Sequence, residues 1–340
     1  MGVVIYWYDA ICFAIVGVAM LVSVYMLWTR ERGGRMEETI MYHSFLVPRL
    51  HTYHNNNNNN NFISWSQLWS SCWRGLHPGW LLGFRLTSFF LLAAFLSWDI
   101  HVWGASIFIY YTEWTFALVM LYFAIGSVMS AYGCWLYCSK HGRSLNVQDI
   151  EADGDTGESR SRKGDSNYYQ EQEQEPTLQR AGFWGYLMQI VYQTCAGAVI
   201  LTDVVFWGII VPLLSNARLG LNLLMGCMHT VNAVLLIVDT SINGLPFPWF
   251  RLAYFVLWSS AYVVFQWVIH LIGFSWWPYP FLELSTPWAP LWYLGIAVVH
   301  IPCYGLYILI VKAKNSILSR LFPRVFIRPH GEILDDSKTD

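Results

Sequence analysis

A histidine lies near the middle of an apolar stretch that is long enough to cross a bilayer. His229 belongs to the stretch 220–238, and Asn222, His229, Asn232 and Asp239 follow one another at steps of seven, three and seven residues. On an α-helix these steps place the four side chains on one face. A titratable ring is costly in hydrocarbon, so such residues usually face a partner, a cavity or a reacting group. This polar stripe therefore indicates a functional site.

Two more polar residues lie within apolar runs and complete a candidate catalytic set. Asp203 lies in the run 198–214, and Thr112 lies near the start of the run 107–138. With alternating passes, Thr112, Asp203 and His229 all fall in the outer half of the membrane. A hydroxyl, an imidazole and a carboxylate at one depth could act as nucleophile, base and orienting group. We therefore take Thr112, His229 and Asp203 as candidate catalytic residues.

The same side chains also fit functions without catalysis. Polar residues hydrogen-bond between membrane helices for packing alone. Asp203 and Glu113 could instead bind a proton or a cation in a transporter, although the sequence shows no inverted repeat. Arg85 and Arg251 lie near helix ends, where arginine side chains are expected to extend toward the interface.

The composition indicates a membrane protein. Of the 340 residues, 55% are hydrophobic, 17% aromatic and only 12% charged, whereas a soluble domain carries about a quarter charged residues. The net charge of −2 argues against a nucleic-acid partner. Seven cysteines without a CxxC pair indicate neither a zinc site nor a disulfide framework. We expect no metal and no cofactor, and membrane lipids as partners.

The apolar runs predict an all-α, polytopic transmembrane helical bundle with seven passes. Each run reaches the ~20 residues that a helix needs to span the hydrocarbon. The runs are 4–28, 79–99, 107–138, 184–214, 219–239, 250–273 and 289–312. The corresponding divisions are an N-terminal transmembrane helix (1–30), a cytosolic loop (31–78), passes two and three (79–138), a second loop (139–182), passes four to seven (183–313) and a cytosolic tail (314–340).

Two segments differ from the bundle in composition, and the basic residues predict its orientation. The run 55–61 is all asparagine, and the acidic, polar segment 139–182 predicts a disordered loop. Lys and Arg gather in 30–74, 140–180 and 312–328, whereas 100–111 and 274–288 contain none. The positive-inside rule then places the N-terminus outside and the C-terminus in the cytosol. The expected membrane is that of the endoplasmic reticulum or the plasma membrane.

Three short motifs resemble one superfamily in sequence and in order. They are Tyr110-Tyr-Thr-Glu-Trp-Thr-Phe-Ala-Leu, then Met228-His-Thr-Val, then Trp267-Val-Ile-His-Leu-Ile-Gly followed by Tyr279-Pro-Phe-Leu-Glu. Together they resemble the rolling-stone-like proteins and, more distantly, the androgen-induced family of membrane threonine hydrolases. The resemblance runs from about residue 79 to 312.

The resemblance implies a reaction and two residue roles. In the hydrolase branch the threonine of the first motif is the nucleophile and the histidine of the second is the base, which correspond here to Thr112 and His229. The substrates of that branch are fatty-acid esters of hydroxy fatty acids, cleaved within the bilayer. Glu113 and Trp114 are closer to the Asn-Trp of the rolling-stone branch, which is associated with cell fusion. A hydrolase and a non-enzymatic membrane protein are therefore both expected from the resemblance.

Overall fold

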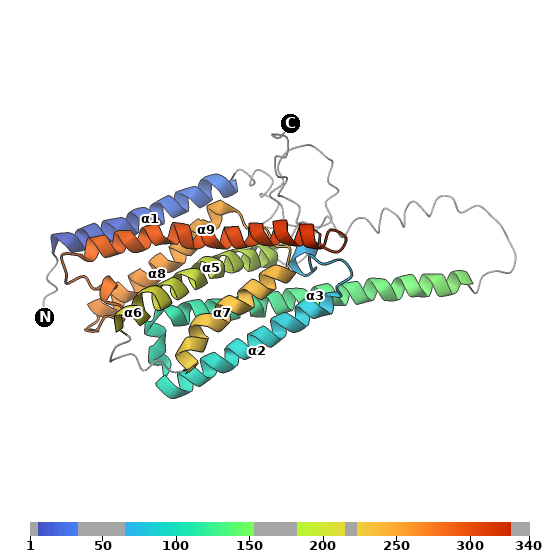
Figure 1. Ribbon diagram of the computed structural model, residues 1–340, viewed down its shortest axis with the longest axis horizontal. Coiled ribbons are helices and arrows are strands. Elements are labelled where there is room, and N and C mark those ends of the chain that lie inside the picture. Colours follow the sequence, from blue (N-terminus) through green and yellow to red (C-terminus); the bar gives the residue numbers. More distant parts are fainter. Residues whose placement is uncertain (1–5, 33–64, 153–181, 215–222, 328–340) are drawn as a thin grey trace.

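Long helices make up almost all of the computed structural model, which describes residues 6–32, 65–152, 182–214 and 223–327 (Figure 1). The helices are α1 (Trp7–Arg32), α2 (Pro78–Trp103), α3 (Tyr111–Ala152), α5 (Phe183–Val205), α6 (Val211–Leu214), α7 (Leu223–Ile242), α8 (Leu252–Leu271) and α9 (Ala289–Leu321). Within these residues, β pairing is limited to two isolated bridges. The predicted all-α class is confirmed.

The helices match the predicted passes closely. Six helices in the described part of the chain are long and apolar enough to cross a membrane, and the apolar part of α7 is shorter. One pass is continuous across two labels, because a π-helical turn at Phe206–Ile210 joins α5 to α6. The chain therefore forms a multi-pass helical membrane bundle, as its sequence predicts.

Local signals set the ends of α2. His77 caps its N-terminus, where the ring Nδ1 accepts the Gly79 N–H at 3.0 Å, and Pro78 occupies the first helical position. Proline suits that position because its missing N–H would have no helical partner. Gly104 ends the helix at φ 75°, a left-handed conformation that side chains with a Cβ rarely adopt. The chain then reverses through a short 3₁₀ turn, Ala105–Ile109, into α3.

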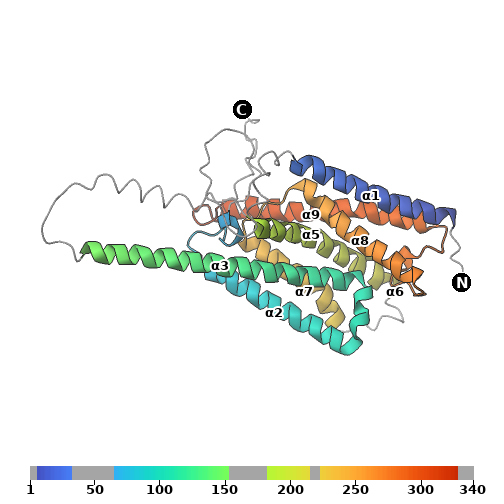
Figure 2. The ribbon, with the colours of Figure 1, turned by 180° about the vertical axis from the view of Figure 1, so that it is seen from behind.

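One boundary of the predicted loop is wrong. α3 continues for 42 residues to Ala152, so the start of the segment 139–182 is helical rather than disordered. Its apolar part ends at Ser139, and the remainder projects beyond the other helices (Figure 2). The asparagine run 55–61 and residues 153–181 lie outside the described residues.

α5 lies at the centre of the bundle. It packs against α3, α7, α8 and α9, while α2 pairs with α3, and α1 lies along α8 and α9 (Figures 1 and 2). Two apolar clusters result. One is built mainly on α2, α3, α5 and α7, and the other lies between α1, α5, α8 and α9. The polar residues of α5 and α7 thus face inward toward neighbouring helices.

A short extended segment before α2 closes one end of the bundle. The Cys72 N–H donates to the Ile242 carbonyl at the end of α7 at 2.9 Å. The Arg74 N–H donates to the Val325 carbonyl after α9 at 2.6 Å, and the Ile327 N–H donates to the Cys72 carbonyl at 2.8 Å. The segment therefore joins the ends of α7 and α9. We call this end of the bundle the Ile242 end and the opposite one, where α3 begins, the Thr112 end.

Candidate functional site

The polar stripe of α7 faces the interior of the bundle. His229, Asn232 and Asp239 are all buried, which confirms the inward orientation expected of the stripe; Asn222 lies outside the described residues. The three do not share one environment, because His229 lies toward the Thr112 end and Asp239 toward the Ile242 end. The stripe therefore contributes to two separate polar regions.

His229 has an aromatic neighbour but no hydrogen-bond partner in the described part of the chain. Its ring stacks on Phe206 of the π-helical turn, with ring centroids 3.5 Å apart and planes 9° apart. Its Nδ1 is buried without a hydrogen-bond partner. Buried polar groups are nearly always paired, so an unpaired imidazole nitrogen is a strong sign of a group available to a ligand or substrate.

Asp203 lies on α5 just before the π-helical turn that holds Phe206. Its Oδ1 is buried and lacks a hydrogen-bond partner among the described residues. π-turns are rare, and they occur frequently at functional sites. Asp203 is therefore three residues before Phe206, whose ring stacks on His229.

Thr112 lies in the first turn of α3 and is buried. Its side chain interacts with the Tyr279 phenol, which also accepts the Tyr111 N–H at 3.2 Å. Tyr279 precedes the short 3₁₀ turn between α8 and α9, and burial raises the pKa of its phenol to about 12. The sequence motif contains Tyr279, but its position beside Thr112 becomes visible only in the fold.

Two interhelical contacts bring the three candidate residues to the same end. The Thr202 hydroxyl on α5 donates to the Thr115 hydroxyl on α3 at 3.4 Å, one turn from Thr112 and next to Asp203 in the chain. The Phe206 ring then connects α5 to His229. No hydrogen bond joins any two of Thr112, Asp203 and His229 in the described residues. The fold therefore gathers these groups at one end without linking them.

A second polar region, built around an ion pair, lies toward the Ile242 end. Arg85 of α2 and Asp239 of α7 form an ion pair at 3.0 Å, and both side chains are completely buried. Asp239 also accepts hydrogen bonds from the Tyr122 hydroxyl and, at 2.7 Å, from Asn243 Nδ2. Arg85 Nη1 donates to the Ser130 hydroxyl at 2.7 Å. The prediction that Arg85 extends toward the interface is wrong, because the Asp239 carboxylate holds it inside.

Arg251 is also held within the protein. It is buried, and its Nη1 donates to Gln193 Oε1 of α5 at 3.1 Å. Gln193 Nε2 in turn donates to the Pro246 carbonyl at 2.8 Å. The Arg251 Nε lies 4.0 Å from Glu31 Oε1 at the end of α1. The expectation that Arg251 extends toward the interface is therefore wrong here too, since its side chain bonds to Gln193 of α5 and pairs with Glu31 of α1.

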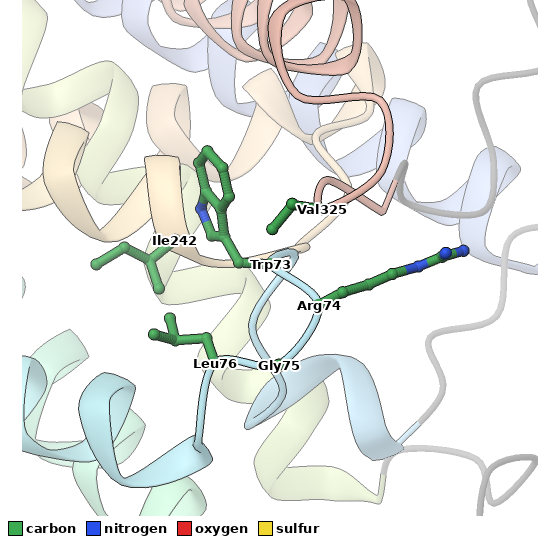
Figure 3. Close-up of a pocket in the computed structure, with 6 residues that line it drawn as sticks. All are labelled: Trp73, Arg74, Gly75, Leu76, Ile242 and Val325. Carbon is green, nitrogen blue, oxygen red and sulfur yellow. The ribbon is translucent and has the colours of Figure 1, made fainter.

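An open hollow of about 430 Å³ lies at the Ile242 end (Figure 3). It is lined by Trp73, Arg74, Gly75, Leu76, Ile242 and Val325. The Arg74 side chain extends away from it (Figure 3), so the remaining wall is largely apolar. At a helical rise of 1.5 Å per residue, Ile242 is about 20 Å along α7 from His229. The hollow is therefore not the candidate catalytic site.

The described residues contain no cluster of three side chains suited to hold a metal ion. Comparison of the chain with protein-family models, curated proteins and solved structures gives no match. The fold and the composition define the chain as a multi-pass helical membrane protein.

Proposed function

We propose that this protein is an intramembrane hydrolase of lipid esters, with Thr112 as nucleophile, His229 as base and Asp203 as the orienting carboxylate. The observation that carries the proposal is the buried His229 ring, whose Nδ1 has no hydrogen-bond partner in the described residues. The other buried histidine of the described residues, His300, also has an unpartnered nitrogen, Nε2, but its Nδ1 donates to the Ile296 carbonyl at 2.7 Å. The resemblance to membrane threonine hydrolases supports the same two residues.

The chemistry follows from the groups at the Thr112 end. His229 would remove the Thr112 hydroxyl proton as the oxygen attacks the ester carbonyl, and would then protonate the leaving alcohol. Water would release the acyl group from Thr112 in a second step, with His229 again as base. Asp203 would stabilise the imidazolium in between. Catalytic hydrogen bonds are often long without substrate and tighten when it binds, so the separation of these groups is compatible with the proposal.

The substrate class follows from the surroundings. An acyl chain would enter a site between membrane helices from the bilayer, without crossing water. The protein's partners would then be membrane lipids, with a fatty-acid ester of a hydroxy fatty acid as the first substrate to test. The basic loops favour an orientation with the Ile242 end in the cytosol and the N-terminus outside, in the endoplasmic reticulum or the plasma membrane.

An activity-based probe for serine and threonine hydrolases tests the proposal on the purified protein in lipid nanodiscs. Thr112→Ala should abolish labelling, and His229→Ala should reduce ester hydrolysis by at least about 100-fold, the lower range for a general base. Thr87→Ala, an exposed threonine of α2, and His300→Ala are matched controls, since each changes the same residue type away from the Thr112–His229 pair, and both should keep labelling and hydrolysis. Labelling of Thr112→Ala at the wild-type level would refute the proposal.

Proton or cation transport is a second candidate, favoured by two carboxylates. Glu113 Oε2 and Asp203 Oδ1 are both buried and unpartnered in the described residues. Ion uptake into proteoliposomes that is lost in Asp203→Asn would favour transport, whereas hydrolysis in detergent would not depend on a sealed vesicle. A folded protein inactive in both assays would point to the non-enzymatic cell-surface or assembly role of the rolling-stone-like branch.

A further inference from the structure

Two cysteines of α3 differ from most of the others in the described chain. Cys138 is exposed and Cys134 is partly exposed, whereas Cys12, Cys72, Cys195 and Cys303 are buried. Cys134 and Cys138 are one helical turn apart, so they share one face of α3, and their thiols interact with each other. The bundle thus presents a pair of accessible thiols on a single helix.

The pair lies where α3 leaves the membrane. The apolar part of the helix ends at Ser139, directly after Cys138. Around the thiols, Trp135 is 63% exposed and Tyr132 and Tyr137 are also exposed, and such aromatic side chains gather at the membrane–water interface. Both thiols are therefore at or just below the polar headgroups.

A contact with α2 supports the same depth. The Tyr137 ring packs edge-on against His77, with centroids 5.1 Å apart, and His77 caps the helix that starts at Pro78. The loop before α2 and the exit of α3 therefore meet at one level. This level is the Ile242 end, where the basic residues Lys140 and Arg143 follow in the sequence.

Other uses of two neighbouring thiols do not fit. Cβ atoms one turn apart on a helix are about 5–6 Å from each other, whereas a disulfide needs about 3.8 Å. Both cysteines are free in the structure. The described residues supply no third metal ligand near them. Thiols at the membrane boundary are, however, the ordinary sites of reversible fatty acylation.

We propose that Cys134 and Cys138 are S-acylation sites that accept a long-chain acyl group from an acyl-coenzyme A donor. The cysteine thiolate attacks the donor's thioester carbonyl, a new thioester forms on the protein, and the coenzyme A thiolate leaves and takes up the proton. The acyl chain then enters the bilayer next to α3. The proposal depends on the Ile242 end facing the cytosol and not on hydrolysis at Thr112.

Acyl exchange on the full chain expressed in cultured eukaryotic cells tests this proposal. Free thiols are blocked, hydroxylamine cleaves thioesters, and a maleimide polymer adds a mass shift to each released thiol. We expect two hydroxylamine-dependent shifts in the wild type, one in Cys134→Ala or Cys138→Ala, and none in the double variant. The matched control Cys195→Ala, which alters a buried thiol on α5, should keep both shifts.

Two results would overturn the proposal. One is a wild-type chain without any hydroxylamine-dependent shift, and the other is a double variant that retains the shifts. Metabolic labelling with an alkynyl fatty acid gives an independent readout on the same variants. Because the two side chains are at the lipid-facing surface, the double variant should elute from a sizing column as the wild type does, so a lost shift reports acylation and not misfolding.

Discussion

Replacing Asp239 by asparagine should destabilise the bundle, because it leaves the Arg85 guanidinium charged and unpaired inside it. Both side chains of this ion pair are completely buried, and the Arg85 Nε to Asp239 Oδ1 distance is 3.0 Å. Asp239 also accepts hydrogen bonds from Tyr122 and Asn243. Asparagine keeps the shape of the side chain but loses the charge and one acceptor oxygen.

The expected loss is large compared with an ordinary interhelical contact. Removing one partner of a buried ion pair costs about 3–5 kcal/mol, mainly because the remaining charge is uncompensated. Neutral hydrogen bonds between membrane helices contribute roughly 0.6 kcal/mol on average. Asp239→Asn and Arg85→Met should each cost about 3–5 kcal/mol, and the double variant should cost less than their sum by about 2 kcal/mol.

Reversible unfolding of the purified protein in mixed micelles, for the wild type and the three variants, gives this coupling energy directly. Arg74→Met is the matched control, since it removes a guanidinium that is exposed near the same end, and it should change the free energy of unfolding by less than about 0.5 kcal/mol. A coupling energy near zero, or single variants as stable as the control, would show that the pair is not what holds α2 to α7.

Two further predictions concern packing and pH. A Cβ on Gly133 of α3 would lie 2.1 Å from the Trp69 ring, so Gly133→Ala should lower the free energy of unfolding by about 1–3 kcal/mol. A Cβ on Gly83 would meet nothing within 4 Å, so the control Gly83→Ala should leave that free energy unchanged or raise it by up to about 1 kcal/mol. Equal losses of stability for both variants in thermal unfolding would contradict the packing of Gly133 against Trp69. Burial raises the pKa of Tyr279 from 10.0 to about 12, so its phenol stabilises the fold fully below pH 10 and less as the pH rises toward 12. In Tyr279→Phe, unfolding measured across this range should show a shallower decline; an identical pH profile would show that the buried Tyr279 phenol does not contribute to the pH dependence of stability.

The sequence predicted the helices well because length and hydropathy decide them. Each apolar run is long enough to cross a bilayer, and inside hydrocarbon a helix satisfies every backbone group internally. Hydropathy does not indicate the end of α3, for the converse reason. Beyond Ser139 the side chains are polar, so hydropathy carries no information there, and the helix continues to Ala152.

The partners of the polar residues could not be predicted in the same way. The spacing of His229 and Asp239 places them on one face of α7, but it does not say which helix that face meets. Arg85 comes 154 positions before Asp239, and its apparent position near a helix end suggested an interfacial side chain. Only the packing of α2 against α7 reveals the pair. Thr112 next to Tyr279 is a similar case, since the two come from segments far apart in the chain.

The length of α3 has a consequence for whatever follows it. The helix rises about 1.5 Å per residue, so Ala152 lies about 20 Å along the helix axis beyond Ser139, where the apolar part ends. Glu151, in the last turn of α3, is therefore separated from the level of Ser139 by about twice the Debye length of about 8 Å at physiological salt. Salt therefore screens charges at the tip of α3 from charges at the level where its apolar part ends, so the two ends of this polar extension are electrostatically independent.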